Sequence, residues 1–355
     1  MFSVKKNIIK TATAFITAGV LLTGCTGGGA TGEVYENAIT DVSGTVVIYT
    51  SMYEDIIEML EPVMARVFPN VSVEFFYGGT GSLQARIAAE MVAGRLGADM
   101  LMVADPSYAL ELRAENMLHS FNSPEASHLA FDYCPDGYWY PVRISNMVLA
   151  FNPDRYSLDE IPTTMHGFAF DERVAGAISM SNPLSSGTAL ASIVALYGVY
   201  GIDYYAALGR QQVMIESGSV ALTKLETGEC MVVMVLEESV LQRREIDGSN
   251  LEVIYPEDGT IVIPSPVMII NDDWSANQNT DAAEAISNWF LSPAGQAYMV
   301  QGWMHSARAD APNPPFDAIP TNDIRANAMS VDWERASMER ELFREKFLDN
   351  VMIPE

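Results

Sequence analysis

The chain has 355 residues, a formal net charge of −26 at pH 7 and a hydrophobic fraction of 49%. This excess of carboxylates excludes nucleic acid as an expected partner, because binding a phosphate backbone requires clustered lysine and arginine side chains. The apolar fraction excludes a disordered acidic tail, and in a chain of this length it is enough to fill two hydrophobic cores.

The N-terminus has the order of features of an export signal. Three lysines within the first ten residues precede an apolar run that is too short for a dependable membrane span. The run ends in LTGC at residues 22–25, which resembles the lipobox of bacterial lipoproteins, where the cysteine sulfur is acylated. We therefore predict a signal peptide over residues 1–24, lipidation of Cys25, and a flexible tether over residues 25–44, which contain TGGGATGE.

From residue 45 onward, short β-rich runs alternate with helical stretches. The runs TVVIYT, VSVEFFY and ADMLMVA are each followed by a helix-forming segment, at residues 54–67, 82–95 and 106–117. This rhythm predicts a largely parallel sheet with helices on both faces, because parallel strands need crossover connections. The rhythm is interrupted at residues 118–137.

The alternation resumes in the second part of the chain. A β-rich segment, GYWYPVRISNMVLAFN, spans residues 137–152, and the runs AISMSN, QVMIES and CMVVMVLEE follow, with helices predicted from 187 and 219. After VIYPEDGTIVIPSPVMIIND we predict helices at residues 281–303 and 333–349. Two series of strands and helices predict an α/β chain with two lobes.

A glycine-rich turn lies between an aromatic pair and a helix-forming stretch in FFYGGTGSLQARIAAE, residues 75–90. Gly81 and the glycines before it permit a sharp bend, while Thr80 and Ser82 bring hydroxyl groups to the helix start. Unpaired N–H groups at a helix start attract anions. A nucleotide phosphate loop is excluded, because no Gly-Lys-Ser/Thr follows and Gln84 replaces the third glycine of the dinucleotide motif. The turn is therefore either an anion site or an ordinary helix N-cap.

Two further hydroxyl-rich turns precede predicted helices. They are Ser185-Ser186-Gly187-Thr188 and Ser217-Gly218-Ser219. Open α/β sheets bind ligands at such strand-to-helix turns. If all three turns face one cleft, an anion receives backbone N–H bonds, hydroxyl bonds and favourable helix dipoles together. The alternative is three separate N-caps.

The cysteines and histidines form no catalytic or metal-binding pattern. Cys134 and Cys230 either pair as a disulfide in an oxidising exterior or remain as two buried free thiols. The four histidines have no close metal-ligand spacing, and neither GxSxG nor HExxH occurs. We therefore expect no enzymatic activity, no bound metal and no cofactor.

The order of these segments resembles that of the periplasmic binding proteins of ABC importers, in the group that binds ferric ion, thiamine, 2-aminoethylphosphonate or hexose phosphates. VVIYTSMYED and GGTGSLQARIAAE are similar to the first two ligand loops of that group, and VRISNMVLAFNPD, SNPLSSGTALASIVALYG, SGSVALTKLETGE and WFLSPAGQAYMV follow in the same order, within residues 45–305. The resemblance implies a type II-like two-lobed periplasmic-binding-protein fold with the ligand cleft between the lobes. It assigns residues 45–143 and 266–355 to lobe one and residues 144–265 to lobe two.

The resemblance also implies positions for ligand contacts. Ser51 lies in the first ligand loop, and Tyr53 follows it as an aromatic wall of the cleft. Arg143 is placed near the anion, where a planar guanidinium grips two oxygens of a phosphate, phosphonate or carboxylate. The alternatives are a strand-end turn at Ser51, a core or rim position for Tyr53, and a structural ion pair for Arg143.

Glu237 and Glu238 mark a departure from the ferric-binding relatives, which carry adjacent tyrosines as iron ligands at this place. Another adjacent pair, Tyr204 and Tyr205, falls on a helix earlier in lobe two, where we expect a packing role. An ionised carboxylate only accepts hydrogen bonds, so the two glutamates suit sugar hydroxyls or an ammonium group. The alternative is a solvated helix start.

Together these features predict an extracytoplasmic, lipid-anchored monomer that captures a small anionic solute, either a phosphorylated sugar or a phosphonate, and delivers it to ABC permease subunits. It contacts the membrane through the lipid anchor only, in the periplasm or on the outer face of the membrane. The alternatives are a ferric-iron-binding receptor of an ABC importer, an extracytoplasmic sensor with the same fold, and an exported enzyme. The predicted ligand-binding residues are Ser51, Tyr53, Thr80, Gly81, Ser82, Arg143, Ser185, Ser186, Gly187, Thr188, Ser219, Glu237 and Glu238.

Overall fold

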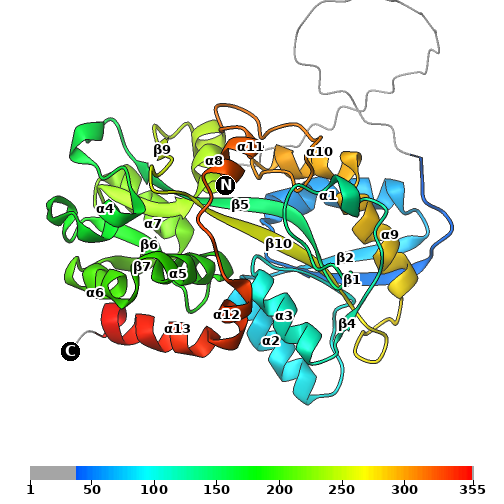
Figure 1. Ribbon diagram of the computed structural model, residues 1–355. Coiled ribbons are helices and arrows are strands. Elements are labelled where there is room, and N and C mark those ends of the chain that lie inside the picture. Colours follow the sequence, from blue (N-terminus) through cyan, green and yellow to red (C-terminus); the bar gives the residue numbers. More distant parts are fainter. Residues whose placement is uncertain (1–36, 354–355) are drawn as a thin grey trace, which may run out of the picture. The chain divides into compact units, whose positions relative to one another are not determined.

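The computed structural model describes residues 37–353, and the predicted signal peptide and Cys25 lie outside this part of the chain (Figure 1). Residues 37–43, the part of the predicted tether that is described, form a loop. In this loop the N–H of Ile39 donates to the carbonyl of Val67 (2.7 Å). The end of the predicted tether is therefore attached to lobe one before the first strand begins.

The strands are β1 (Gly44–Thr50), β2 (Val71–Tyr77), β3 (Met100–Met102), β4 (Leu118–His119), β5 (Tyr140–Phe151), β6 (Ile178–Ser181), β7 (Met214–Glu216), β8 (Val232–Leu236), β9 (Glu252–Ile254) and β10 (Ile261–Ile270). The α-helices are α1 (Glu54–Val67), α2 (Thr80–Val92), α3 (Pro106–Ala114), α4 (Met165–Phe170), α5 (Gly187–Tyr200), α6 (Ile202–Arg210), α7 (Gly218–Thr227), α8 (Glu237–Asp247), α9 (Thr280–Leu291), α10 (Pro293–Gln301), α11 (Thr321–Ala326), α12 (Trp333–Met338) and α13 (Arg340–Phe347). Short 3-10 turns are η1 (Ala126–His128), η2 (Leu158–Glu160) and η3 (Glu172–Val174), and η4 (Leu348–Met352) is a π-helical turn.

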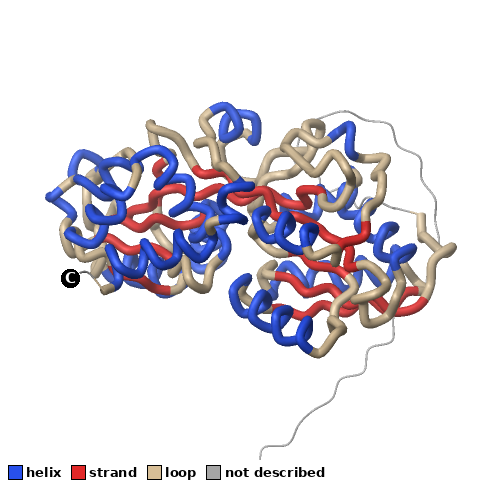
Figure 2. Tube along the Cα trace, turned by 60° about the horizontal axis from the view of Figure 1, so that its bottom comes forward, coloured by secondary structure: helices blue, strands red, loops and turns tan. Residues whose placement is uncertain are grey.

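The strands form one mixed sheet in the order β2-β1-β3-β10-β5-β8-β6-β7, with β4 on β10 and β9 on β5. β1 pairs in parallel with β2 and β3, and β6 pairs in parallel with β7 and β8. Each end of the sheet is therefore parallel, as the alternation of strands and helices predicts. Helices cover both faces (Figure 2), and the predicted two-lobed α/β fold is confirmed.

Each lobe has its own hydrophobic core. The lobe-one core contains side chains of β1, β3, α1, α9 and α10, and the lobe-two core contains side chains of β6, β8, α4, α5 and α6. Tyr140 and Val142 at the start of β5 are buried in the lobe-one core, whereas Leu149 and Phe151 at its end are buried in the lobe-two core. β5 therefore crosses between the lobes, and the antiparallel strand β10 crosses beside it (Figure 1).

The local sequence of α1 explains how a helix joins its core. Ile56, Leu60, Val63 and Val67 are spaced three or four residues apart and are all buried in the lobe-one core. This spacing places apolar side chains on one face of an α-helix, so the face that meets the core is encoded locally.

The crossing of β5 and β10 is also where the strand ladder is interrupted. Pro264 and Pro266 lie in the middle of β10, and the pairing with β5 shifts its register between Ser265 and Pro266. Proline cannot donate a ladder hydrogen bond, and a register shift of this kind bends a strand. Arg143 pairs with Ser265 at this irregularity, so its side chain projects from the crossing between the lobes.

The C-terminal helices pack against the lobe-two core. Ala336, Phe343, Phe347 and Val351 are buried there, although residues 266–355 are assigned to lobe one by the sequence. Figure 1 shows α12 between α5 and α3. We therefore propose that these helices belong with lobe two, and the other lobe boundaries remain proposals.

Within residues 37–353, no single helix has both the length and the apolar content to cross a membrane. The bent pair α5 and α6 meets the criterion only when the two helices are taken together, by length and composition alone.

Candidate functional site

A cleft of about 800 Å³ lies where turns of the two lobes face each other. Lobe one contributes residues that follow β1, β2 and β3, lobe two contributes residues that follow β6, β7 and β8, and the centre of β5 lies between them. Open α/β sheets bind ligands at this edge, because helix N-termini and turn residues converge there. The cleft is therefore the candidate ligand site.

Three helices, α2, α5 and α7, begin at the cleft. Ser186 caps α5 and Ser217 caps α7, each accepting a hydrogen bond from a backbone N–H in the first turn of its helix. Gly79 precedes α2 and has no side chain to cap it. The turns both begin helices and line the cleft. The interpretation as helix N-caps and the interpretation as an anion site are therefore compatible.

The turn before α2 touches the turn before α5 through backbone atoms. The N–H of Gly81 donates to the carbonyl of Ser185 (3.0 Å). A Cβ atom on Gly81 would lie 2.8 Å from that carbonyl oxygen, and a Cβ on Gly187 would lie 2.7 Å from the carbonyl oxygen of Ala104. Because real Cβ atoms do not approach carbonyl oxygens so closely, these glycines allow the two lobes to meet at the cleft.

Arg143 is 2% exposed and lines the cleft from the centre of β5. One terminal nitrogen donates to the hydroxyl of Ser51 (3.2 Å), the other contacts the sulfur of Met304 (3.3 Å), and the Nε has no hydrogen-bond partner in the described part of the chain. Among residues 37–353 these bonds reach no carboxylate. Burial lowers the pKa of Arg143, since the charged form is poorly solvated there. Arg143 therefore lines the cleft with one donor, the Nε, unused and with no carboxylate bonded to its guanidinium among the described residues.

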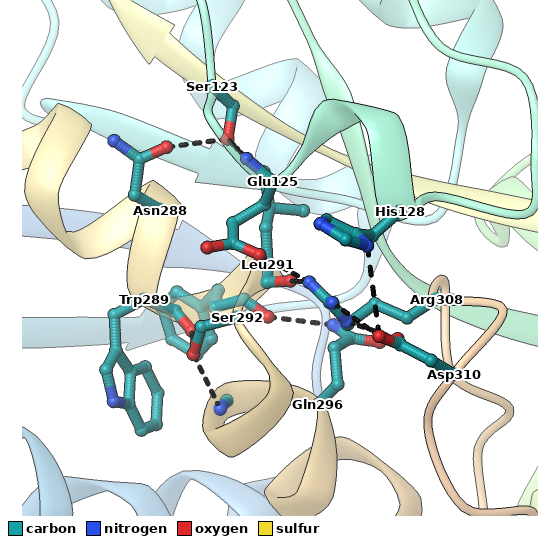
Figure 3. Close-up of polar contacts among 12 residues, drawn as sticks. Ser123, Glu125, His128, Asn288, Trp289, Leu291, Ser292, Gln296, Arg308 and Asp310 are labelled. Atoms are coloured by element: carbon teal, nitrogen blue, oxygen red, sulfur yellow. Dashed lines mark hydrogen bonds and ion pairs between the residues drawn. The ribbon is translucent and has the colours of Figure 1, made fainter. Parts of the chain in front are cut away.

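Arg308 shows how another buried guanidinium of this chain is paired. It is 3% exposed and donates to both carboxylate oxygens of Asp310 (2.7 and 2.9 Å) and to the carboxylate of Glu125 (Figure 3). These hydrogen bonds raise its pKa, with that from Asp310 first. Arg340 is likewise buried and paired with carboxylates. Arg143 differs from both in its partners and in its place at the cleft.

Glu238 lies behind the wall of the cleft near Arg143. It is 2% exposed, and its carboxylate accepts a hydrogen bond from the hydroxyl of Ser145 (2.7 Å). Burial raises the pKa of Glu238, while the Ser145 hydroxyl and the charge of Arg143 act in the opposite direction. Burial also raises the pKa of Tyr53, whose hydroxyl lies 2.8 Å from that of Ser239.

Glu237 is fully buried in a network outside the cleft. Its carboxylate accepts hydrogen bonds from the amide of Asn146 (2.7 Å) and the hydroxyl of Tyr255 (2.7 Å), and it lies 3.1 Å from Nε2 of His305. Both glutamates open α8, but neither is solvated. The carboxylate oxygens of Glu237 are therefore occupied by protein groups, and Glu237 is not among the residues that line the cleft.

The structure brings most of the predicted residues together. Ser51, Tyr53, Thr80, Arg143, Ser185, Ser186, Gly187, Thr188 and Ser219 line the cleft, whereas Gly81, Ser82, Glu237 and Glu238 do not. Gly81 contributes to the contact between the lobes, and the glutamates lie behind the wall.

One wall of the cleft was not singled out by the sequence patterns. It consists of a face of α8, with Ser239, Gln242, Arg243 and Ile246, and of Asp55 opposite that face. Spacings of three and four residues put the α8 side chains on one side of the helix. The sequence signal for this wall is Ile246, an apolar residue in a polar stretch. In the structure its side chain is 61% exposed.

Several other residues from the sequence have structural roles. Tyr204 and Tyr205 are buried, and each donates its hydroxyl to a backbone carbonyl (2.8 Å). Cys134 and Cys230 are free, buried thiols in separate apolar clusters. In the described part of the chain, no three His, Cys, Asp or Glu side chains are grouped as metal ligands would be.

Comparison with known proteins gives a family and a set of similar structures. Residues 97–337 match the family model of the bacterial extracellular solute-binding proteins. AfuA from Actinobacillus pleuropneumoniae, whose structure contains fructose-6-phosphate, is 22% identical, with a TM-score of 0.75 over 88% of this chain and 99% of that one. Iron-bound HitA from Pseudomonas aeruginosa is 17% identical, with a TM-score of 0.73 over 85% and 99%. The periplasmic binding protein P5PA is 18% identical, with a TM-score of 0.70 over 87% and 100%.

The comparison with curated proteins gave no match. These solved structures are at most 22% identical in sequence to this chain, so they establish the fold alone. The family model covers most of the two lobes. The resemblance predicted from the sequence is thus confirmed. The chain belongs to the family of bacterial extracellular solute-binding proteins.

Proposed function

We propose that this chain is the extracytoplasmic substrate-binding lipoprotein of an ABC importer, and that it captures a small anionic solute, either a phosphorylated sugar or a phosphonate. The observation that carries this proposal is the state of Arg143. Its guanidinium is buried at the cleft, its two bonds reach a hydroxyl and a thioether, and its Nε has no hydrogen-bond partner among residues 37–353. A buried cation with unused donors is stabilised by an anion that fits the same space.

The helix starts around Arg143 favour the same class of ligand. Thr80, Ser186 and Thr188 line the cleft at the first turns of α2 and α5, and Ser219 lines it at α7. Backbone N–H groups and the helix dipole make such positions favourable for negative charge. Because both lobes supply donors, one anion is able to bond to both.

Closure of the two lobes is the mechanism we propose. Tyr53 of lobe one bonds to Ser239 of lobe two, and the Asp55 carboxylate accepts a hydrogen bond from Gln242. A ligand that contacts both lobes shifts the population toward the form with these contacts made, since it binds that form more tightly. In this proposal the closed form is the one that docks on the permease.

A thermal-shift screen tests the class of ligand. At a concentration a hundredfold above the dissociation constant, a ligand stabilises the folded protein by about 2.7 kcal/mol. We expect stabilisation by sugar phosphates or phosphonates and a weak or absent effect of ferric iron, the alternative suggested by the similarity to HitA. Arg143→Met should abolish the response, and Arg325→Met, an exposed arginine of α11, is the matched control.

Strong stoichiometric iron binding without any response to anions would replace this proposal with the ferric receptor. A response to anions that survives Arg143→Met would retain the class of ligand but remove Arg143 from the site.

The lipid anchor is proposed from the sequence of residues 22–25. Cys25→Ala removes the acylated sulfur, so the protein should be released from membranes or remain unprocessed. Membrane fractionation of cells that express Cys25→Ala checks this. Normal cleavage with unchanged membrane association would contradict the lipoprotein proposal.

A further inference from the structure

The cleft continues well beyond Arg143 along two elements that lie side by side. Ser51 bonds to Arg143, Tyr53 bonds to Ser239 at the start of α8, and Asp55 bonds to Gln242 one helical turn further on. Residues 51, 53 and 55 of lobe one therefore follow α8 of lobe two away from the guanidinium.

The length of α8 indicates how far this part of the cleft extends. Ser239 and Asp247 both line the cleft. An α-helix rises about 1.5 Å per residue, so these two residues are about 12 Å apart along the helix axis. The volume of about 800 Å³ also falls in the range of pockets that hold a whole small molecule, rather than a bare inorganic anion.

The charges along this cleft are unevenly distributed. The carboxylates among its lining residues are Asp55 and Asp247, both of which lie at the end away from Arg143. Arg243 lies beside them and is paired with Glu226 (3.5 Å) and Asp247 (3.6 Å). A second anionic group would be repelled at this end, because the carboxylates are negatively charged and the Arg243 charge is already balanced by Glu226 and Asp247.

We propose that the α8 face formed by Ser239, Gln242, Arg243, Ile246 and Asp247, together with Asp55, binds the hydroxyl-bearing body of the ligand and so determines which anionic solute is captured. The inference rests on the proposed function and narrows it to phosphorylated sugars or other polyol phosphates. The anionic group lies at Arg143, and the body extends along α8.

The chemistry of this wall matches hydroxyl groups. Asp55 and Asp247 only accept hydrogen bonds, the guanidinium of Arg243 only donates, and the amide of Gln242 does both. A hydroxyl also donates and accepts, so it is able to satisfy neighbouring groups of either kind. An ammonium group only donates hydrogen bonds, so it would satisfy the carboxylates but not the donors of Arg243 and Gln242, whereas the hydroxyls of a polyol can satisfy both kinds of group.

The sequence predicts contacts to sugar hydroxyls or an ammonium group at Glu237 and Glu238, and we place these contacts on the α8 face instead. Those carboxylates are 0% and 2% exposed and are bonded to protein groups. The side chains of Gln242 and Ile246 lie one and two turns further along the same helix and line the cleft directly. Selection is thus assigned to a different part of α8.

Calorimetry with three probes tests the inference: inorganic phosphate, glucose 6-phosphate and 2-aminoethylphosphonate. Gln242→Ala should lower the affinity for glucose 6-phosphate roughly fivefold to tenfold relative to phosphate, as expected for the loss of a hydrogen bond to the body. The ratio of the two affinities is the readout, since a variant that only impairs closure weakens both probes equally. Gln301→Ala, on an exposed side chain of α10, is the matched control.

A second variant fills the end of the cleft away from Arg143 with a larger side chain, instead of removing a hydrogen bond to the ligand. Ile246→Trp adds bulk at a residue that is already 61% exposed, so the variant should fold normally and lose affinity for glucose 6-phosphate by a much larger factor than for phosphate. Val199→Trp, at an exposed apolar position of α5 outside the cleft lining, is the matched control.

The outcomes separate this inference from the proposed function. If none of the three probes, inorganic phosphate, glucose 6-phosphate and 2-aminoethylphosphonate, binds the wild-type protein, both fail. If the anions bind but Gln242→Ala and Ile246→Trp weaken phosphate and glucose 6-phosphate by the same factor, only the role of the α8 face is overturned. A preference for 2-aminoethylphosphonate over glucose 6-phosphate that Asp55→Asn removes would overturn the polyol body in favour of an ammonium group.

Discussion

Arg143 and Arg308 bury the same charge to nearly the same depth, at 2% and 3% exposure, but their surroundings differ. Arg308 is held by Asp310 and Glu125, whereas within the described residues Arg143 has a hydroxyl and a sulfur as partners and no partner for its Nε. Removing one member of a paired set leaves unpaired carboxylates, while removing an unpaired buried charge removes a cost of desolvation. The two arginines should therefore respond oppositely to the same substitution.

We expect Arg308→Met to lower the free energy of unfolding by about 1–3 kcal/mol, because several charge-assisted hydrogen bonds are lost. Arg143→Met should leave the stability of the ligand-free protein unchanged or raise it. Chemical denaturation of both variants without ligand checks this. Equal destabilisation by the two substitutions would show that Arg143 is a structural residue.

Glu238 gives a prediction about pH. Burial raises its pKa in the folded state, so the folded protein binds more protons than the unfolded chain at pH values between the unfolded and folded pKa. Its contribution to stability is then fully present below the unfolded pKa and is lost as the pH rises through the folded pKa. Glu238→Gln removes this titration while keeping an acceptor for Ser145.

The stability difference between the wild type and Glu238→Gln should therefore shift in favour of the variant as the pH rises from about 4 to about 7. Denaturation curves at several pH values measure this difference. A difference that is constant with pH, or that shifts in favour of the wild type, would contradict a raised pKa for Glu238.

At the scale of elements, the turns before α2 and α5 are the points at which the lobes meet. Gly81→Ala places a Cβ 2.8 Å from the Ser185 carbonyl oxygen and 2.9 Å from the Ser185 Cα, both of which are backbone atoms. The closed contact should therefore be strained, and ligand affinity should fall for all ligands by a similar factor. Calorimetry measures the loss.

Gly198→Ala is the control for that substitution, since a Cβ at this position of α5 meets no atom of the described residues within 4 Å. Replacing a helical glycine by alanine should stabilise the protein by roughly 0.5–1 kcal/mol without changing affinity. If Gly81→Ala binds ligand as tightly as Gly198→Ala does, the turns do not meet in the ligand-bound form.

The three turns could be predicted from the sequence because their signals are local. Small and hydroxyl-bearing residues before an apolar helix indicate a helix start, and the order of strands and helices places those starts at one edge of the sheet. The α8 face could not be predicted in this way. Whether a polar helix face meets a cleft or bulk water depends on Asp55, which is 187 residues away from its partner Gln242.

Local sequence patterns could not predict the burial of Glu237 and Glu238 either. Two adjacent carboxylates at a helix start are usually solvated, and the helix dipole favours them there. Here Asn146, Tyr255 and His305 enclose Glu237, and they come from β5, the segment after β9 and the segment after α10. Only the tertiary structure brings these donors to one carboxylate.

At the scale of the whole molecule, the C-terminal helices connect the two lobes. Phe343 and Phe347 pack in the lobe-two core, while Arg340 is paired with Asp105 and bonds to the hydroxyl of Ser107 (2.9 Å) at the start of α3 in lobe one. The sequence could predict that this segment is helical, but not which core it joins, because an amphipathic pattern does not specify its partner.

We expect Arg340→Met to weaken the connection between the lobes and shift the ligand-free protein toward a more open form. Asp105 keeps bonds from Gln84 and Ser107, so the fold should survive. Small-angle X-ray scattering should then give a larger radius of gyration without ligand.

Arg335→Met is the matched control, because Arg335 pairs with Glu339 four residues further along the chain and lies over rings of lobe two. The same radius of gyration for Arg340→Met, Arg335→Met and the wild type would show that the C-terminal helices do not restrain opening.

The most direct test of the central claim, that the cleft captures an anionic solute at Arg143, is native mass spectrometry of protein purified without refolding. The wild type should retain a small phosphate- or phosphonate-bearing molecule, and Arg143→Met, prepared in the same way, should not retain it. A retained ferric ion without such an anion, or the same anionic molecule retained equally by wild type and Arg143→Met, would contradict the account.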